Sequence, residues 1–358
     1  LKSTINDKSF NRFGPSYLTS NIADKTKYYK WYNKLGAVYE NKTLGRFLFY
    51  IDDFRANYSY NSIFVFPDYV IPNAISTVIN TINGQYEYKK GKWDGKFLFT
   101  TAISNQAMTN LDASINYKFN DKNQVSFQYQ NISKVPDNIY ELHQSSYLGY
   151  NWFNDFKNEK NNNIIINAIT QWANLSFQAS TLTDHLYFSD DDDSYEIQIV
   201  TPKQYDKTIN YLSLKLSKEI TYGKFALDNT FLFQKVDQSE PILNVPTFVT
   251  RNTFYYSEYF FKRALFLQTG IAFNYFTDYY SDTHNPVIGE FFVQEETKIG
   301  NYATFDFFVN ARIRQTRIFV MAEHFNSSFA PTSTYFSAPN NPYRDFVIRF
   351  GIVWNFFQ

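Results

Sequence analysis

The sequence predicts an all-β fold, a transmembrane antiparallel up-and-down β-barrel of about 16 strands, within a range of roughly 14–18. Three observations predict it. Phe and Tyr number 38 and 30 against two Met, a composition that favours strands over helices. Apolar and polar residues alternate along many segments of strand length. Short and long connections alternate between these segments, as they do in bacterial barrels.

The alternation is sharpest in four segments. Across 111–119 every odd position is apolar and every even position is polar or charged. Odd positions are also apolar in 124–130 and in 304–313, where Phe308 is the one exception to the alternation, whereas in 212–217 the apolar residues stand at even positions. Because successive side chains of a strand point to opposite faces, each segment has one apolar and one polar face.

Fifteen segments are long enough, or nearly so, to cross a bilayer at a tilt, which takes about 10 residues. They are 28–40, 44–60, 82–90, 94–105, 108–119, 123–133, 162–171, 174–188, 206–219, 223–236, 247–261, 264–279, 302–313, 316–327 and 343–357. Bacterial single-chain barrels have even strand numbers, so one more strand is expected around 9–18. The segments 143–153 and 286–296 also have strand-like composition, but the alternation of connections places both in loops. The long loops are 61–81, 134–161, 189–205, 237–246, 280–301 and 328–342.

Whole-chain properties exclude several other classes of protein. No stretch approaches about 18 consecutive apolar residues, so no transmembrane helix is predicted. The net charge of zero, without a basic stripe, gives no reason to expect a nucleic acid partner. The absence of cysteine excludes a disulfide scaffold, a thiolate metal site and a thiol nucleophile.

A soluble β-sandwich also alternates, so two further features decide for the membrane. Charges and amides continue along most of each polar face, as a wet lumen requires, and aromatic residues lie near the ends of the apolar faces, as in the girdles that flank the lipid band. These aromatic residues are Trp31, Tyr32, Tyr58, Tyr60, Tyr279, Tyr280 and Trp354.

The last predicted strand carries the most specific signal. Even positions from 346 to 356 form one unbroken apolar row. Arg349, Gly351, Trp354 and Phe356 resemble the C-terminal β-signal of outer-membrane proteins, a polar residue and a glycine followed by alternating apolar residues. The sequence departs from that pattern because Phe357 and Gln358 follow Phe356. An exposed terminal edge must be recognised and paired for a sheet to close, which is the physical reason for such a signal.

Several strings resemble the family of putative porins from Bacteroidota: 260–269 (FFKRALFLQT), 311–326 (ARIRQTRIFVMAEHFN), 342–357 and 223–234 (GKFALDNTFLFQ). The hairpin that starts in 154–174 is also similar to one in TonB-dependent receptor barrels. The resemblance implies a multi-pass β-barrel in the outer membrane of a Gram-negative bacterium and a pore role, and it supplies no catalytic residues. It covers the last two-thirds of the chain well and the first third loosely.

We expect a single barrel domain over 1–358. The first 25 residues are polar and irregular, and members of the family are usually longer. Both points favour the interpretation that the chain is the C-terminal part of a longer protein.

Candidate catalytic and metal-binding residues are few. Barrel enzymes use a His with a Ser or Asp near the external rim, and the four histidines are His143, His185, His284 and His324. Asp184 and Asp282 lie near two of them, but no nucleophile motif accompanies them. We therefore interpret all four as wet loop or rim residues and predict no enzyme and no cofactor. The acidic run 190–193 could hold Ca²⁺, but its spacing matches no defined loop, so we interpret it as a solvated external loop and predict no metal.

The predicted functional residues are charged side chains on the polar faces of well-defined strands. In lipid each would cost a few kcal/mol, so they must face water or a partner. A pore lining and a structural charge network inside a closed barrel are equally compatible with them. The residues are Asp112, Lys118, Lys215, Asp228, Asp306, Arg312 and Arg349.

The predicted function is therefore a porin-like passive diffusion channel for small polar solutes. The alternative is a structural or scaffold role as the barrel subunit of an outer-membrane complex for secretion, barrel assembly or lipoprotein handling. That role would use long external segments with exposed apolar residues: Ile63, Phe64, Val65, Tyr69, Phe291 and Phe292. The expected partners are outer-membrane lipid, the barrel-assembly machinery during insertion, and other outer-membrane proteins or lipoproteins.

Overall fold

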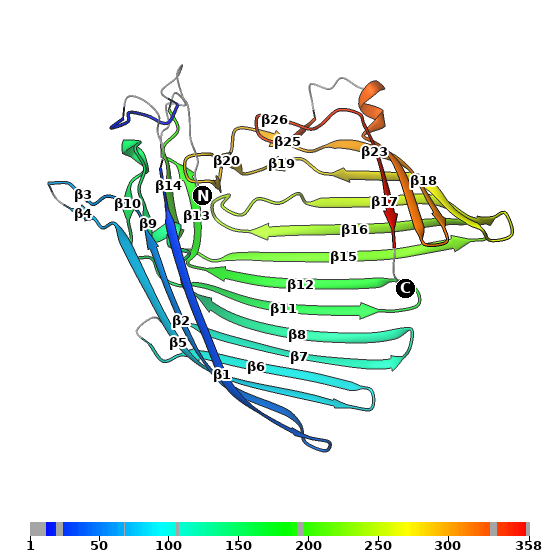
Figure 1. Ribbon diagram of the computed structural model, residues 1–358, viewed down its shortest axis with the longest axis horizontal. Helices are drawn as coiled ribbons and strands as arrows, with labels where there is room; N and C mark the ends of the chain where they lie inside the picture. Colours follow the sequence, from blue (N-terminus) through cyan, green and yellow to red (C-terminus); the bar gives the residue numbers. More distant parts are fainter. Residues whose placement is uncertain are drawn as a thin grey trace.

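The computed structural model describes residues 12–18, 24–67, 69–104, 107–191, 197–329 and 335–355. Its main element is one antiparallel sheet of 15 strands, in which each strand pairs with its neighbours in chain order (Figure 1). The strands are β1 (Lys27–Asn41), β2 (Gly45–Ser59), β5 (Ala74–Lys90), β6 (Trp93–Ala102), β7 (Thr109–Asn120), β8 (Asn123–Lys134), β11 (Glu159–Ile169), β12 (Asn174–Thr183), β15 (Ile209–Tyr222), β16 (Phe225–Asp237), β17 (Phe248–Phe260), β18 (Leu265–Phe276), β23 (Tyr302–Ile313), β24 (Thr316–Glu323) and β27 (Val347–Trp354).

The predicted all-β, up-and-down fold class is confirmed, and each of the fifteen predicted segments overlaps one of these strands. The further strand expected around 9–18 is not found in its described part. Residues 9–11 lie outside the described residues, and within 12–18 only Ser16 forms a bridge, with Tyr147. The strand-like segments 143–153 and 286–296 are loops, as predicted, with only short strands of their own.

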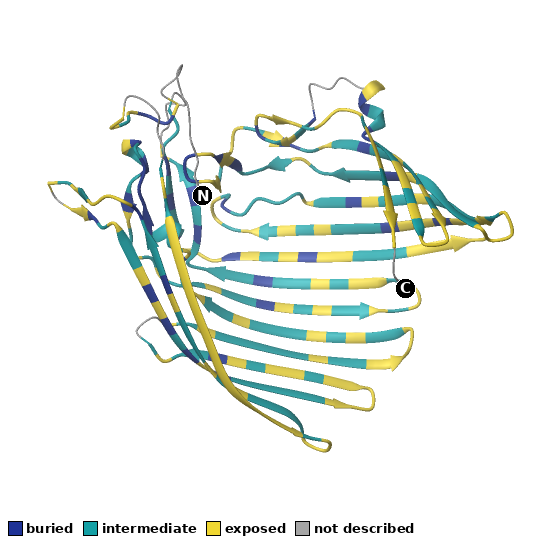
Figure 2. Ribbon diagram, in the orientation of Figure 1, coloured by how far each residue is buried: buried dark blue, intermediate teal, exposed yellow. Residues whose placement is uncertain are grey.

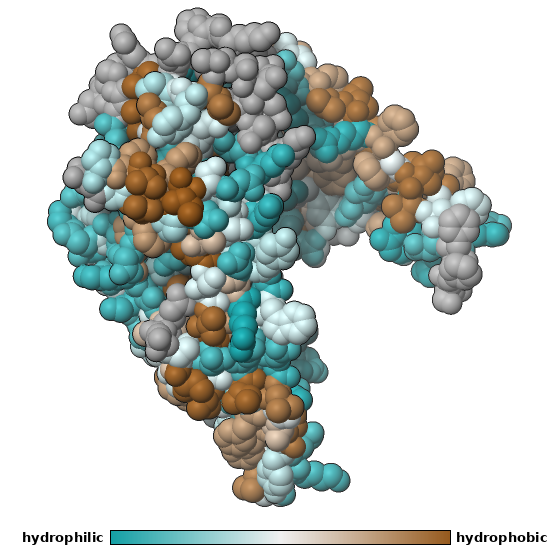
Figure 3. All heavy atoms as spheres, turned by 60° about the vertical axis from the view of Figure 1, so that its left-hand side comes forward, coloured by the Kyte–Doolittle hydropathy of each residue, from teal (hydrophilic) through white to brown (hydrophobic). Residues whose placement is uncertain are grey.

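The sheet is strongly curved and open along one seam. Among the described residues β1 pairs only with β2, and β27 pairs only with β24. Figure 1 shows these two strands well apart, and Figure 3 shows the hollow that the curved wall leaves between its arms. Among the described residues, no helix is long and apolar enough to cross a membrane.

Strand register divides the sheet into two faces of different chemistry. Ile166 pairs with Phe177 and Phe127 on one face, whereas the next residue, Asn167, pairs with Ser176 and Ser126 on the other. We call these the apolar face and the polar face. Apolar side chains on the apolar face stay solvent-exposed although they are large, as Phe254 and Phe350 are. Figure 2 shows the resulting change of exposure from residue to residue along many strands. Lipid is the solvent that suits such a surface.

Aromatic rings form a belt on the apolar face where the strands meet their short turns. Phe47 packs against Tyr86 with ring centroids 4.6 Å apart, and Trp93 packs against Tyr117 at 4.5 Å. Rings of this kind anchor a barrel at the membrane interface. The predicted girdle was only partly right about its members: Trp31 and Trp354 are exposed, but Tyr60 is buried in a loop cluster and Tyr279–Tyr280 form a short strand outside the main sheet.

The long loops fold into a layer with its own apolar cores at the other end of the strands. The first cluster gathers Tyr150, Trp152, Phe188 and Phe292 from three loops, together with Phe13. Short elements build this layer: β3 (Phe64–Val65), β4 (Val70–Ile71), α1 (Asn138–Glu141), β9 (Leu142–His143), η1 (Leu148–Tyr150), β10 (Trp152–Phe153), β13 (His185–Asp190), β14 (Val200–Tyr205), β19 (Tyr279–Tyr280), β20 (Thr283–Asn285), β21 (Glu290–Phe292), β22 (Lys298–Ile299), η2 (Phe325–Phe329), β25 (Phe336–Ala338) and β26 (Asn341–Pro342). We call this end the loop end and the opposite end the turn end.

Candidate functional site

The polar face is the candidate site because it carries all the predicted functional charges. Asp112 pairs with Gln130, Lys215 with Ser176, Asp306 with Ala272, and Arg349 with Met321, so their side chains share that face. Lys118, Asp228 and Arg312 lie on it as well. Their role in lining a pore stays a prediction.

The polar face is hollowed in the middle of the wall. A cavity of ≈ 580 Å³ lies over β15 to β24, and all its lining residues have the parity of the polar face. Asp228, Glu219 and Arg251 supply its charges. The predicted residue Asp228 therefore lines a hollow, together with two charged residues that sequence reasoning missed.

Carboxylates elsewhere on this face are held by amides and hydroxyls. Asp52 accepts hydrogen bonds from Tyr32 Oη at 2.9 Å and from Asn83 Nδ2 at 3.0 Å. Asp112 accepts from Gln128 Nε2 and Gln130 Nε2, both at 2.9 Å. These hydrogen bonds tie each carboxylate to side chains of neighbouring strands. Asp112 is thus hydrogen-bonded to two neighbouring side chains of the wall.

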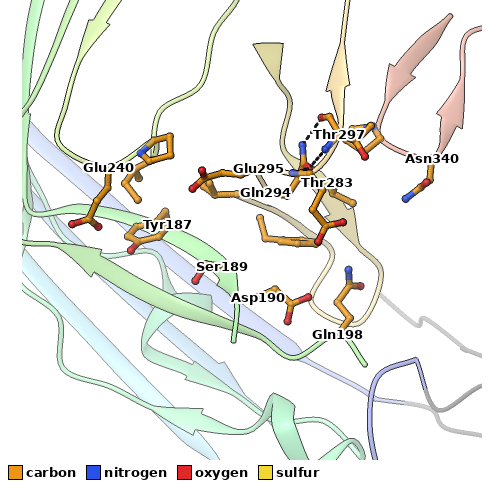
Figure 4. A pocket seen from close by; sticks show the side chains of 16 residues that line it. Tyr187, Ser189, Asp190, Gln198, Glu240, Thr283, Gln294, Glu295, Thr297 and Asn340 are labelled. Carbon is orange, nitrogen blue, oxygen red and sulfur yellow. Dashed lines mark hydrogen bonds between the residues drawn. The ribbon is translucent and has the colours of Figure 1, made fainter. Parts of the chain in front are cut away.

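The two ends of the wall have hollows of opposite charge. At the loop end, a pocket of ≈ 470 Å³ is lined by Asp190, Glu240, Glu295 and Glu296, and no Lys, Arg or His is among its described lining residues. Figure 4 shows Glu240, Tyr187 and Asp190 on one side of it and Gln294 and Glu295 on another. At the turn end, a hollow of ≈ 360 Å³ is lined by four arginines and no described carboxylate.

Comparison with known proteins identifies the family. The model of the family described as "Putative porin" matches residues 2–358. The chain belongs to this family. No curated protein sequence matches the chain closely enough to mark a relative.

Solved structures share the fold of this porin-family chain. The siderophore receptor PirA from Acinetobacter baumannii superposes with a TM-score of 0.62 at 11% identity over 94% of this chain and 55% of its own. The FrpB iron transporter from Neisseria meningitidis (F3-3 variant) gives 0.60 at 11% identity over 94% and 56%. The copper transporter OprC gives 0.60 at 11% identity over 86% and 52%. The chain thus spans about half the length of these proteins, and at such identities the likeness establishes the fold alone. Family and fold together make the chain an outer-membrane β-barrel protein.

The predicted C-terminal signal lies partly within the described residues of this porin-family chain. Arg349 pairs with Glu323, and Trp354 is exposed on the apolar face. Gly351 lies under the ring of Phe319, where a Cβ would overlap the ring, which explains the glycine. Phe356 lies outside the described residues. Recognition of this segment as a signal stays a prediction.

Two of the four histidines are buried, which corrects the interpretation that all four are solvent-exposed loop or rim residues. His143 and His324 are 5% and 1% exposed because the loop layer packs around them. His185 Nδ1 lies 2.7 Å from Glu159 Oε2, Asp184 pairs with Lys160, and burial raises the pKa of Asp282 to about 6. His284 is exposed and its ring packs against Phe291.

No group of three or more metal-ligating side chains occurs among the described residues. In the acidic run, Asp190 accepts a hydrogen bond from the backbone N–H of Ile199, and Asp191 forms an ion pair with Lys203.

The external apolar residues are mostly exposed, as the sequence suggested. Ile63, Val65 and Tyr69 stand out on the β3–β4 hairpin, with Val65 76% exposed. Phe291 is also exposed, and Phe64 is partly buried. Phe292 is the exception, since it is buried in the first loop cluster.

Proposed function

We propose that the chain forms the wall of a water-filled passage through the outer membrane of a Gram-negative bacterium, by which small polar solutes diffuse. The observation that carries the proposal is the polar face, which continues over all 15 strands, whereas apolar residues predominate on the opposite face of strands such as β7, β11, β23 and β27. A charged side chain at the lipid midplane costs about 2–4 kcal/mol, so a face with this many charges needs water. The names of the similar structures, which are transporters and a receptor, agree with a transport role.

Single-channel recording in a planar bilayer tests the passage. Protein extracted from its native outer membrane, folded by the criterion of heat-modifiable gel mobility, should give discrete current steps. The same preparation unfolded by boiling is the control. Folded protein that inserts and carries no current would contradict the proposal.

A second candidate is a scaffold role in an outer-membrane complex, and the β3–β4 hairpin favours it. Its exposed side chains Ile63, Val65, Tyr69 and Val70 form an apolar tip at the loop end, where other outer-membrane proteins or lipoproteins could bind. A Val65→Ser/Tyr69→Ser variant should then lose partners that co-extract with the wild type in mild detergent, and a Lys207→Ser variant should keep them. A wild-type chain that extracts alone would speak against this role.

We also propose that the barrel-assembly machinery recognises β27 as a signal during insertion. Gly351→Val should slow insertion because the new side chain meets Phe319. Ser337→Val, in the loop layer, is the control. Equal amounts of both variants in the outer membrane would contradict this role of Gly351.

A further inference from the structure

The turn-end hollow is built by two neighbouring hairpins. Arg312 and Arg317 are cross-strand partners on the polar face of β23 and β24. Arg263 and Arg314 come from the turns that follow β17 and β23. Tyr259 and Phe266 form the floor, since Phe266 pairs with both Arg312 and Tyr259 in the register of the sheet.

These four arginines form no ion pair with any residue in the described part of the chain. The carboxylates on adjoining strands are engaged elsewhere. Glu258 lies on the apolar face, where it pairs with Lys224, and Glu323 pairs with Arg344 and Arg349. Like charges directly opposite each other destabilise a sheet, so the Arg312 and Arg317 pair is unfavourable unless an anion lies between them.

The backbone at the two turns gives a second, independent observation. Arg263 and Arg314 have φ angles of 70° and 52°. This left-handed region favours Gly and Asn, so local conformation does not select arginine at either position. Both residues therefore carry a positive charge at a place where turn geometry alone would prefer another residue.

Aromatic rings orient the guanidinium groups and leave most of their donors free. The Cζ atom of Arg312 lies 5.4 Å from the Phe266 ring centre, and that of Arg263 lies 6.0 Å from the Tyr259 ring centre. Arg312 donates one hydrogen bond, to Tyr259 Oη at 3.3 Å. Guanidinium groups stacked in this way present their N–H edges for bidentate contact with an oxyanion.

We propose that this hollow binds a soluble phosphate-bearing anion at the turn-end rim of the passage. A phosphate group carries more than one charge and several acceptor oxygens, which suits several guanidinium forks better than a single carboxylate does. The anion is soluble rather than a lipid headgroup because Arg312 and Arg317 lie on the polar face, away from the lipid-facing side chains. This binding site adds a ligand class to the proposed passage. It rests on that proposed function only for the route by which the anion reaches the hollow.

Equilibrium binding of labelled inorganic phosphate to the purified, folded protein in detergent tests the site. The Arg312→Gln/Arg317→Gln variant should bind phosphate at least about tenfold more weakly than wild type, because charge-assisted contacts are lost. Lys30→Gln/Lys96→Gln is the matched control. It removes the same charge from the same face, at residues that form no ion pair in the described structure, and should bind as wild type does. Rising salt should weaken wild-type binding.

A second pair guards against a folding defect in the first. Arg263→Gln/Arg314→Gln changes only exposed turn residues and should also weaken phosphate binding, whereas the Arg→Lys counterpart should recover part of it. The proposed site would be wrong if wild type and both Arg→Gln variants bound phosphate equally. It would also be wrong if the Lys→Gln control variant lost as much phosphate binding as the Arg→Gln variants. Binding to phospholipid vesicles without binding to inorganic phosphate would also overturn it.

Planar-bilayer current separates this inference from the proposed function. Phosphate binding without current would remove the passage and keep the site, whereas current without phosphate binding would remove the site and keep the passage.

Discussion

Glu323 and Arg349 join the last two strands of the sheet through an ion pair on the polar face. Oε2 of Glu323 lies 3.1 Å from Nε of Arg349 and 3.0 Å from an Nη of Arg344. Glu323 ends β24 and is 8% exposed, while both arginines are about half exposed. The ion pair fixes the return of the chain after the long connection 324–346. The predicted C-terminal signal calls only for a polar residue at position 349. The ion pair with Glu323 gives Arg349 a structural role as well.

Replacing Glu323 by Gln should loosen β27. The change leaves two arginines without their carboxylate, at a cost of about 1–2 kcal/mol because the arginines keep contact with water. Heat-modifiable gel mobility should report a lower unfolding temperature than in wild type. Glu296→Gln, at an exposed position with no ion pair among the described residues, should unfold at the wild-type temperature. Identical temperatures for Glu323→Gln and wild type would contradict this role of the pair.

Two adjacent isoleucines of β11 test which face meets lipid. Ile166 is on the apolar face and 40% exposed, and Ile165 pairs with Gln178 and Gln128 on the polar face. Ile166→Lys should cost about 2–4 kcal/mol in a bilayer, whereas Ile165→Lys should be much milder. Urea titration of the protein folded into vesicles measures both. A larger loss of stability in Ile165→Lys than in Ile166→Lys would contradict the assignment of the apolar face to lipid.

His143 should make the loop layer sensitive to acid. It is buried, its ring packs against Trp152, and its Nδ1 lies 2.7 Å from the Tyr150 carbonyl oxygen. Burial lowers the pKa of His143 to about 4, although that hydrogen bond and Asp24 act in the opposite direction. The folded pKa of His143 lies below its unfolded value of 6.5. Neutral His143 therefore makes its full contribution to the free energy of unfolding above pH 6.5. This contribution is lost as the pH falls from 6.5 towards 4, by up to about 3 kcal/mol.

Hydrogen exchange of segment 142–153, corrected for the intrinsic rate at each pH, measures this loss. Protection should fall between pH 6.5 and pH 4 in wild type. The His143→Gln variant should show a flat profile over the same range. A variant that still loses protection on acidification would assign the effect to another group.

Tyr150 should hold three loops together. It is fully buried, its Oη donates to the Gln198 carbonyl oxygen at 2.6 Å and accepts from Asn285 Nδ2 at 2.9 Å. Tyr150→Phe removes both bonds and leaves buried polar groups unpaired, which costs about 1–3 kcal/mol. Limited proteolysis of the loops should accelerate, with the heat-modifiable mobility of the barrel unchanged. Tyr69→Phe, on the exposed hairpin, should be cleaved at the wild-type rate, and a Tyr150→Phe variant cleaved no faster would exclude this role.

The strands could be predicted because their two faces meet different solvents. The period of two in 111–119 and 304–313 reports this difference directly, and the strands lie where it places them. The polar face of β2 was missed because it mixes Arg46 and Asp52 with Leu48 and Phe54, which weakens the period. Asp52 is identified only by the hydrogen bonds that reach it from β1 and β5.

The loop layer could not be predicted, because its contacts join residues far apart in the chain. Phe13, Tyr150, Phe188 and Phe292 form one cluster although no local pattern relates them. The same reason hid the burial of His143. The arginine hollow likewise depends on two turns meeting side by side, which sequence spacing does not reveal.

Because the sequence has no cysteine, single introduced cysteines can report which face of a strand meets water. Single cysteines placed in turn at 164–167 of β11, in protein folded into vesicles, are treated with a membrane-impermeant maleimide. We expect labelling at 165 and 167 and protection at 164 and 166. Labelling without this alternation, or strongest at 164 and 166, would contradict the assignment of one face to water and the other to lipid.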